Sequence, residues 1–329
     1  MACAVAWLDI SKAGAEKNTQ RMYRTTINYF KPLNEVPISE IRHSHLQQIV
    51  NEHLEHPKTC KNILGTFSQI IRSAARDRLI TKDAVQDILE DISLPHYVKP
   101  QKRALTAVEK AALGNVKLDD KKMTFLLILY YCGLRRQEAL ALTPASFDWE
   151  KKTIRVREVL IFDGNNSEIK AYPKSDHGLR DVPMADALIE KIRSFVEEAG
   201  EGFLFHTRDS ETMTETGYRR MWESIVTALN IAAGYDPFAK KNRGEKPITG
   251  LTAHIFRHNY CTELCYQVPA LSTKMIAKLL GDDERMVLEV YSHIVYEKEN
   301  VAETINKVFT SVVSQYFANR NIAGFLRAA

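Results

Sequence analysis

The stretch TFLLILYYCGLRRQE, residues 124–138, sets an unbroken apolar segment directly before a glycine and a pair of arginines. Residues 124–132 are apolar on every side of a helix, which predicts a helix buried in a core. Gly133 stands where a C-cap residue would end that helix. Arg135 then falls at the start of the next helix, where backbone amides also favour anions. The stretch therefore predicts an arginine at the edge of a buried helical core.

Four further motifs follow in the chain and carry residues that can bind or attack an anion. In order they are Tyr172-Pro173-Lys174, His254-Ile255-Phe256-Arg257-His258, Leu279-Leu280-Gly281-Asp282 and Val290-Tyr291-Ser292-His293. With the first stretch they supply three fixed cations, a titratable ring and one phenol, from Arg135, Lys174, Arg257, His254 and Tyr291.

Such a set suits attack on a phosphodiester. The transition state carries more charge on the non-bridging oxygens, which two arginines can grip through planar forks that stay protonated. A phenol has an ordinary pKa of about 10, so Tyr291 would pass its proton to a nearby base or phosphate oxygen and form a covalent phosphotyrosine. Lys174 would protonate the departing 5′ oxygen. No metal or other cofactor is required, and no clustered carboxylates resemble a magnesium site.

At these residues the chain resembles the tyrosine recombinases, or phage-type integrases, from about Trp7 to about Asn306. Four segments are similar to the first-arginine box, the β-hairpin lysine, the His-x-x-Arg-His box and the nucleophile box, namely Gly133–Arg135 with Glu138, Lys174, His254 with Arg257 and His258, and Tyr291–His293. Their order and spacing carry the resemblance. It implies that Glu138 orients a neighbouring histidine or arginine and that His258 has a supporting role.

The resemblance implies a mainly α fold with a small antiparallel β-sheet, divided into a helical core-binding domain and an α+β catalytic domain. We expect the core-type DNA-binding domain at residues 1–92, a proline-containing basic linker at 93–104 and the catalytic domain at 105–308. A C-terminal tail at 309–329 would dock onto a neighbouring protomer or, alternatively, onto its own domain. Many members carry a further N-terminal arm-binding domain; only a short segment precedes the first expected helix here, so we expect that this domain is either absent or has been removed.

Local patterns predict where the main elements lie. Helical periodicity runs from about Asn18 to Asp91, with Ser39 and Thr81 as candidate N-caps. Thr106 would cap a helix through Leu113. Three strands are expected at 153–160, 168–173 and 179–183, with Lys174 at a hairpin tip and a loop at 232–247. A helix at 284–290 would present Tyr291 at its end.

Asp282 departs from the family pattern, which usually has histidine or tryptophan at this position. An ionised carboxylate would repel the phosphate. We therefore expect Asp282 to orient a cation, with Arg285, Arg257 or Lys278 as candidates, or to cap the helix that presents Tyr291. A protonated acid that donates to the phosphate is the competing interpretation.

Two other patterns need an alternative interpretation. His254, His258, Cys261 and Cys265 form one stripe of a helix, but a single straight helix cannot close a tetrahedron of four such ligands around zinc, so core cysteines under a histidine are favoured. Tyr296 and Tyr260 compete with Tyr291 as nucleophile, and Tyr291 is favoured because Ser292-His293 follows it.

The amino-acid composition limits the classes of protein to which the chain can belong. The chain has 329 residues, a net charge of +4, 45% hydrophobic residues and five scattered cysteines. These values are typical of a two-domain protein with reduced thiols, mildly basic and compatible with DNA binding. No apolar run of 18 residues exists, so neither a membrane span nor a membrane partner is expected. A bacterial cytoplasmic, nucleoid-associated location is predicted.

The resemblance implies a site-specific recombinase that cuts and rejoins double-stranded DNA through a 3′-phosphotyrosine, for integration or excision of a mobile element. Four protomers would act on DNA as a tetramer, with an accessory DNA-bending protein or an excisionase as a further partner. Two rival classes stay open. One is a type IB topoisomerase-like enzyme without partner exchange, and the other is a DNA-binding relative that has lost catalysis.

Overall fold

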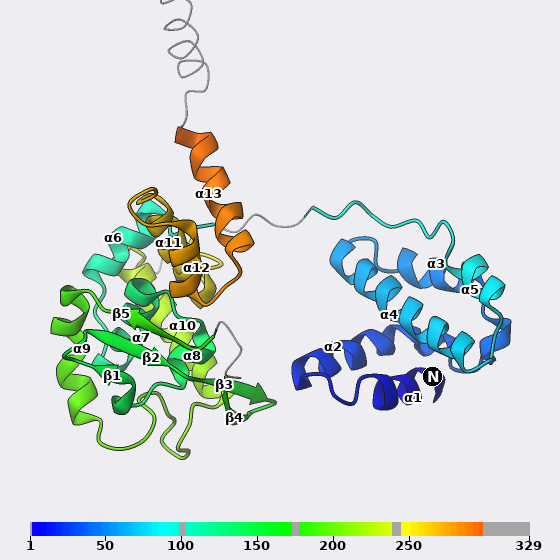
Figure 1. The fold of residues 1–329 in the computed structure, drawn as a ribbon, viewed down its shortest axis with the longest axis horizontal. Helices are drawn as coiled ribbons and strands as arrows, with labels where there is room; N and C mark the ends of the chain where they lie inside the picture. Colours follow the sequence, from blue (N-terminus) through cyan, green and yellow to red (C-terminus); the bar gives the residue numbers. More distant parts are fainter. Residues whose placement is uncertain (1, 99–102, 173–177, 239–244, 299–329) are drawn as a thin grey trace, which may run out of the picture. The chain divides into compact units, whose positions relative to one another are not determined.

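The computed structural model describes residues 2–98, 103–172, 178–238 and 245–298, with side chains described as far as residue 292. The chain divides into two compact units, residues 1–101 and 102–329 (Figure 1). Lys174 and the tail predicted at 309–329 lie outside the described residues.

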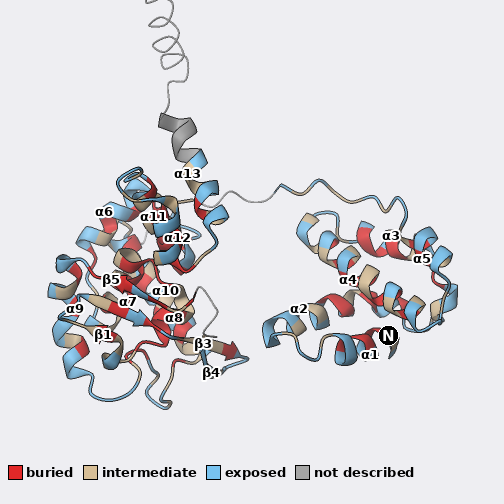
Figure 2. Cartoon of the chain, viewed as in Figure 1, coloured by how far each residue is buried: buried red, intermediate tan, exposed pale blue. Residues whose placement is uncertain are grey.

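The first unit is entirely helical in its described part. Its helices are α1 (Ala2–Ser11), α2 (Lys17–Ile27), α3 (His43–Asn51), α4 (Pro57–Arg76) and α5 (Lys82–Leu89), with 3-10 turns η1 (Asn28–Leu33) and η2 (Ile38–Glu40). One apolar stripe of α4 lies in the core, as the periodicity predicts, and includes Ile63, Phe67 and Ile71 (Figure 2). The other helices pack around that stripe, since burial of an amphipathic face is what stabilises short helices in water.

Two details of this unit differ from the sequence-based expectation. Ser39 does not cap a helix, because it lies inside η2, and α3 instead begins after Arg42, whose backbone N–H donates to His45 Nδ1 at 3.2 Å. The first helix is α1, well before Asn18, and it buries Trp7 in the core. The cap at Thr81 is confirmed, because its hydroxyl accepts the Ala84 N–H at 3.1 Å.

The second unit is built around α7. Its helices are α6 (Ala107–Asn115), α7 (Asp120–Cys132), α8 (Arg136–Leu140), α9 (Asp186–Glu198), α10 (Glu215–Ala232), α11 (Ala253–Cys265), α12 (Thr273–Leu280) and α13 (Glu284–Lys298), with the 3-10 turn η3 (Pro144–Ser146). Phe125, Leu126 and Leu129 of α7 are completely buried, which confirms the predicted core helix. The helix begins before Thr124, because the Asp119 carboxylate accepts the Lys122 N–H at 2.9 Å and caps its first turn.

The strands form two small antiparallel sheets. One has the order β1-β2-β5, from β1 (Phe147–Asp148), β2 (Thr153–Val156) and β5 (Arg180–Pro183), and the other is the hairpin of β3 (Glu158–Asp163) and β4 (Asn166–Ala171). The prediction of a single strand at 153–160 is therefore wrong. The segment divides into β2 and β3 at Arg157, whose guanidinium donates to the carbonyls of Val156 and Arg180 at 3.0 and 2.8 Å. Arg180 pairs with Val156, which brings β5 beside the end of β2.

The last two described helices meet at a tight turn. Gly281 ends α12 in the left-handed region, with φ of +64°, and α13 begins three residues later. The helix α13 runs on to Lys298, so the expectation that it ends before Tyr291 is wrong and Tyr291 lies within it. It packs against both α11 and α12. Among the described residues, no helix combines the length and the apolar character that crossing a bilayer requires.

The turn after α7 generates a stability prediction. Gly133 has φ of +59°, and a Cβ there would lie 2.4 Å from Tyr260 Cδ1. Gly133→Ala should lower the free energy of unfolding by about 2 kcal/mol or more, since a non-glycine residue in the left-handed region costs about 1–2 kcal/mol before any clash. Urea unfolding followed by circular dichroism measures this. Gly114→Ala is the matched control, because a Cβ at Gly114 in α6 meets nothing within 4 Å. Equal stability of the two variants would contradict the prediction.

Candidate active site

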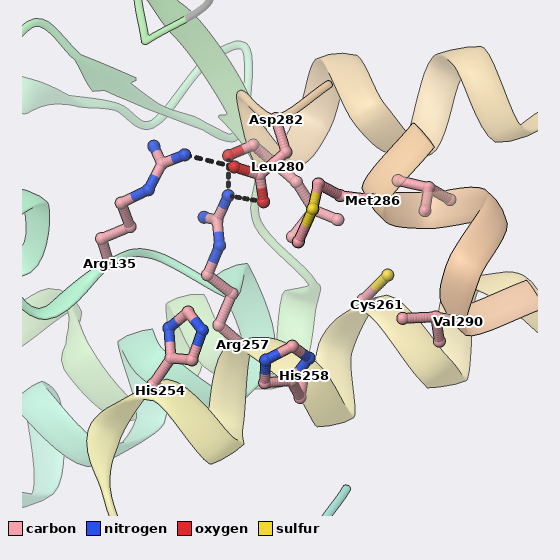
Figure 3. A pocket seen from close by; sticks show the side chains of 10 residues that line it. Arg135, His254, Arg257, His258, Cys261, Leu280, Asp282, Met286 and Val290 are labelled. Carbon is pink, nitrogen blue, oxygen red and sulfur yellow. Dashed lines mark hydrogen bonds and ion pairs between the residues drawn. The ribbon is translucent and has the colours of Figure 1, made fainter. Parts of the chain in front are cut away.

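Residues from four separate elements line a cavity of about 100 Å³ in the second unit (Figure 3). Arg135 precedes α8, Arg257 and the two histidines come from α11, Asp282 follows α12, and Val290 belongs to α13. The full lining is Arg135, His254, Arg257, His258, Cys261, Leu280, Asp282, Met286, Val287 and Val290. The structure thus brings together five of the residues that the sequence singled out, namely Arg135, His254, Arg257, His258 and Asp282.

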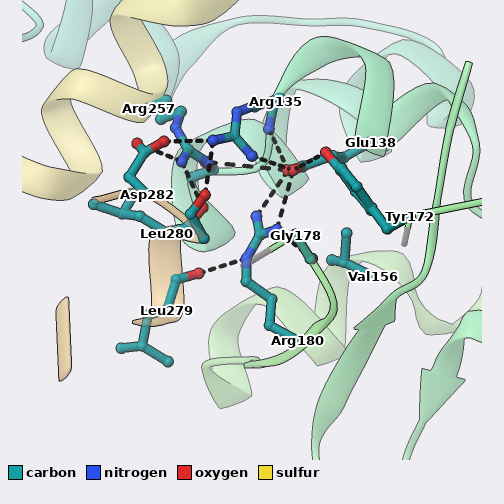
Figure 4. Close-up of polar contacts among 12 residues, drawn as sticks. Arg135, Glu138, Val156, Tyr172, Gly178, Arg180, Arg257, Leu279, Leu280 and Asp282 are labelled. Atoms are coloured by element: carbon teal, nitrogen blue, oxygen red, sulfur yellow. Dashed lines mark hydrogen bonds and ion pairs between the residues drawn. The ribbon is translucent and has the colours of Figure 1, made fainter. Parts of the chain in front are cut away.

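Glu138 is completely buried and contacts Arg135, which lines the cavity. Its carboxylate accepts hydrogen bonds from Arg180 at 2.7 and 3.0 Å, from Arg135 Nη1 at 2.8 Å and from the Tyr172 hydroxyl at 2.9 Å (Figure 4). Arg257 Nη1 lies 4.0 Å away. Glu138 therefore contacts the arginines that an orienting role requires.

The electrostatic environment of Glu138 keeps it ionised. Burial alone would raise the pKa of its carboxyl, but the Arg180 hydrogen bonds and the charges of Arg180, Arg135 and Arg257 outweigh burial and lower the pKa to about 2. Burial of the phenol, together with the charge and hydrogen bond of the Glu138 carboxylate, raises the pKa of Tyr172 to about 12. Tyr172 is thus a neutral donor to Glu138.

The C-terminal carbonyls of α12 hold the same three arginines from the other side. Arg180 Nε donates to Leu279 O at 2.7 Å, Arg257 Nη2 donates to Leu280 O, and Arg135 Nη2 donates to Gly281 O at 2.8 Å. The last carbonyls of a helix have no partner within the helix and carry the negative end of its dipole. Three consecutive residues of one turn thus orient three guanidinium groups.

Asp282 links the two arginines that face the cavity. Its Oδ1 accepts from Arg135 Nη2 and its Oδ2 accepts from Arg257 Nη2 at 2.6 Å (Figures 3 and 4). Burial would raise the pKa of this carboxyl, but Arg257 and Arg135 lower it overall, so the group is an anion.

This geometry decides between the interpretations of Asp282. Of the three cations proposed from sequence, Arg257 is a partner, and Arg135 is a second partner that local spacing did not suggest. The capping interpretation is wrong, because Asp283 accepts the Arg285 N–H at the start of α13 at 2.8 Å. The lowered pKa also opposes a protonated Asp282.

Arg180 is the polar residue that the sequence-based interpretation missed as part of the site. It is only 5% exposed and donates to Glu138, Leu279 and Gly178. The sequence feature that could have identified Arg180 is its position in β5, where Arg180 and Val182 are buried and alternate with exposed Asp181. A charged residue on the inner face of a strand requires a buried partner of opposite charge.

The two histidines of α11 stand one turn apart, with ring centroids 4.6 Å apart and planes at 87°. Cys261 and Cys265 follow on the same helix and are buried in the apolar contact with α12 and α13, as expected of core cysteines. Within the described part of the chain, no three or more metal-ligating side chains gather into a metal site.

Tyr291 is half-buried on α13 and packs in the apolar cluster formed with α11 and α12. Its neighbour Val290 lines the cavity, whereas Tyr291 is not among the described lining residues. Tyr260 is half-buried and packs over Gly133, and burial raises the pKa of its phenol. The Tyr296 side chain, like Lys174, lies outside the described residues.

Comparison with known proteins decides the family. The profile of the phage integrase family matches residues 100–298, and that of the phage integrase central domain matches residues 1–90. The chain belongs to the phage integrase family. It is therefore a tyrosine recombinase, an enzyme class that breaks and rejoins DNA.

The relatives include recombinases and transposon proteins. A XerC-like tyrosine recombinase of Caldanaerobacter subterraneus is 25% identical over 86% of this chain and 75% of its own length. The transposase from transposon Tn916 of Enterococcus faecalis is 26% identical over 73% of this chain, which spans 59% of that transposase.

Solved structures show the same fold. The integrase of transposon Tn1549, in complex with a circular intermediate DNA, matches with a TM-score of 0.69 at 22% identity, over 88% of this chain and 94% of that one. A lambda integrase dimer bound to a core site matches with a TM-score of 0.56 at 16% identity, over 88% and 94% of the two chains. These matches confirm the predicted fold of helices with small antiparallel sheets.

The buried ion pair of Glu138 generates a pH-dependent prediction. Glu138→Gln should lower the free energy of unfolding by about 3 kcal/mol at pH 7, because it leaves buried guanidinium groups without their anion. The folded-state pKa of about 2 lies below the ordinary value of 4.5. The wild-type advantage should therefore be complete above about pH 4.5 and shrink as the pH falls toward 2.

Urea unfolding at a series of pH values measures the effect. Glu263→Gln is the control, since the Glu263–Lys110 pair is exposed and contributes about 0–1 kcal/mol. A pH-independent loss in Glu138→Gln, or a loss no larger than the control, would refute the assigned role of the charge.

Proposed function

We propose that this chain is a site-specific DNA recombinase that integrates or excises a mobile element by cutting and rejoining DNA through a 3′-phosphotyrosine. The observation that carries the proposal is that Arg135 and Arg257 both donate to one carboxylate, that of Asp282, each to a different oxygen. A phosphodiester likewise offers two non-bridging oxygens, and a planar guanidinium fork binds such oxygens well. The arginines supply the positive charge that stabilises the transition state.

Each residue has a defined task in the proposed reaction. Tyr291 forms a bond from its phenolic oxygen to phosphorus as the bond to the 5′ oxygen breaks, and its proton passes to a neighbouring base or a phosphate oxygen. His254 lines the cavity and is the candidate base. Lys174 protonates the 5′ oxygen, and the free 5′ hydroxyl later attacks a partner's phosphotyrosine. Each step exchanges one phosphate ester bond for another, because the phosphotyrosine bond replaces the DNA phosphodiester. Rejoining therefore needs no external energy source.

The relatives support action on a mobile element, because they include the Tn916 transposase and the Tn1549 integrase in complex with transposon DNA. On this proposal the substrate is double-stranded DNA in the bacterial cytoplasm, at the nucleoid, and four protomers assemble on it. An accessory DNA-bending protein or an excisionase sets the direction of the reaction. The DNA complexes of the related integrases support the choice of substrate.

The nucleophile is tested by removing one oxygen atom. Tyr291→Phe should bind DNA with unchanged affinity and form no covalent adduct, because only the attacking hydroxyl is lost. The measurement is a denaturing gel after incubation with nicked suicide substrates made from the ends of the element that carries the gene. Tyr296→Phe is the matched control and should form the adduct at wild-type level. A full-strength adduct from Tyr291→Phe would overturn the assignment.

The roles of the two cavity arginines are tested with lysine substitutions, which keep the positive charge of the side chain but remove the planar guanidinium group. Arg135→Lys and Arg257→Lys should each slow single-turnover cleavage by about a hundredfold or more, because an ammonium cannot make a forked contact with two oxygens. Arg193→Lys is the control, since Arg193 forms an exposed pair with Glu197 on α9. Cleavage by either cavity variant within a few-fold of the control would show that these arginines do not bind the reacting phosphate.

A further inference from the structure

The cavity already contains an anion that belongs to the chain itself. The Asp282 carboxylate gives one oxygen to Arg135 and the other to Arg257. These are the same two guanidinium groups that the proposed reaction assigns to the scissile phosphate. A carboxylate and a phosphodiester each carry one negative charge and present two equivalent oxygens, so the two groups compete for one position.

The charge balance supports this competition. Three guanidinium groups, from Arg135, Arg180 and Arg257, meet two carboxylates, from Glu138 and Asp282, so one positive charge remains in the cluster. Without Asp282, two positive charges would face the cavity and attract any small anion strongly. Asp282 therefore lowers the attraction of the empty site for stray anions.

The two carboxylates differ in what can displace them. Glu138 is completely buried and bonded on several sides, whereas the Asp282 side chain is 28% exposed and sits at the end of a turn. If Asp282 leaves, Arg135 keeps its bonds to Glu138 and Gly281, and Arg257 keeps those to Gly133 and Leu280. The forks therefore stay oriented after the exchange.

We propose that Asp282 is an internal stand-in for the phosphate, which fills the anion position of the DNA-free site and is displaced by the scissile phosphodiester. This inference rests on the proposed function, since it takes the reacting group from there. Asp282 occupies the two guanidinium groups and lowers their net positive charge before DNA binds, while Glu138 and the backbone carbonyls keep them oriented. It is a positioning residue that sets the affinity of the site for anions.

The test uses the full chain without DNA and a small monoanionic diester, dimethyl phosphate, as the probe. Nitrogen-15 NMR of the Arg135 and Arg257 side chains, assigned with the two lysine variants, reports its binding. Asp282→Asn should bind dimethyl phosphate at least about tenfold more tightly than wild type, equivalent to about 1.4 kcal/mol, because a neutral amide competes for the two guanidinium groups much more weakly than a carboxylate does. The neighbouring Asp283→Asn, which removes the same charge at the start of α13, should leave the affinity unchanged.

Two results would overturn the proposal. Unchanged or weaker probe binding by Asp282→Asn would mean that the carboxylate only braces the arginines. Equal tightening by Asp283→Asn would mean that general charge, not occupancy of the forks, is responsible. A second measurement needs no variant: carbon-13 NMR of the wild-type Asp282 carboxylate should move to the position of a solvent-exposed aspartate as the probe saturates Arg135 and Arg257. A static Asp282 signal would contradict displacement.

The outcome is separable from that of the proposed function. Covalent adduct formation by wild type on suicide DNA tests the recombinase chemistry and does not depend on how Asp282 moves. An adduct without tighter probe binding in Asp282→Asn would reject the stand-in alone, and tighter binding without an adduct would reject the recombinase alone.

Discussion

Three guanidinium groups in one partly buried cluster repel one another unless anions and carbonyl dipoles lie between them, and the second unit is arranged to meet that constraint. Glu138 lies beneath Arg135, Arg180 and Arg257, and the C-terminal carbonyls of α12 face the same three groups. Apart from the local Arg135–Glu138 pair, these contacts join elements far apart in sequence, so the whole cluster forms only when α7, α8, β5, α11 and α12 have packed together. The positive charge offered to a substrate is thus fixed by the fold.

The same arrangement connects the arginine cluster to α13, the helix that carries Tyr291, the proposed nucleophile. The turn that accepts from the arginines, Leu279–Asp282, leads directly into α13, which carries Tyr291 and packs on α11 and α12. The left-handed Gly281 permits this turn. A change in what the arginines bind therefore alters contacts made by Leu280, Gly281 and Asp282, which directly precede the helix of the proposed nucleophile. Rigid placement of binding groups before the substrate arrives is how electrostatic catalysis avoids reorganisation during the reaction.

Much of the fold and part of the site could be predicted from sequence, because apolar periodicity and ordered polar motifs are local signals. The buried helix around Leu126 and the shared cavity of Arg135, His254 and Arg257 are examples. Arg257 was correctly expected as a partner of Asp282, but Arg180 as a site residue and Arg135 as the second partner of Asp282 could not be predicted, because their contacts span long sequence separations that local rules do not cover. The break between β2 and β3 likewise depends on Arg157 and β5, which the pattern of residues 153–160 does not contain.

The central claim is that a phosphate held by Arg135 and Arg257 is attacked by Tyr291, and the covalent product tests it most directly. Wild-type protein would be trapped on suicide DNA, digested with trypsin and nuclease, and analysed by tandem mass spectrometry. The peptide Met286–Lys298 contains both Tyr291 and Tyr296, and fragmentation separates them. The account predicts a nucleotide joined through its 3′ phosphate to Tyr291. A nucleotide on Tyr296, on Tyr260 or on a residue other than tyrosine would contradict it.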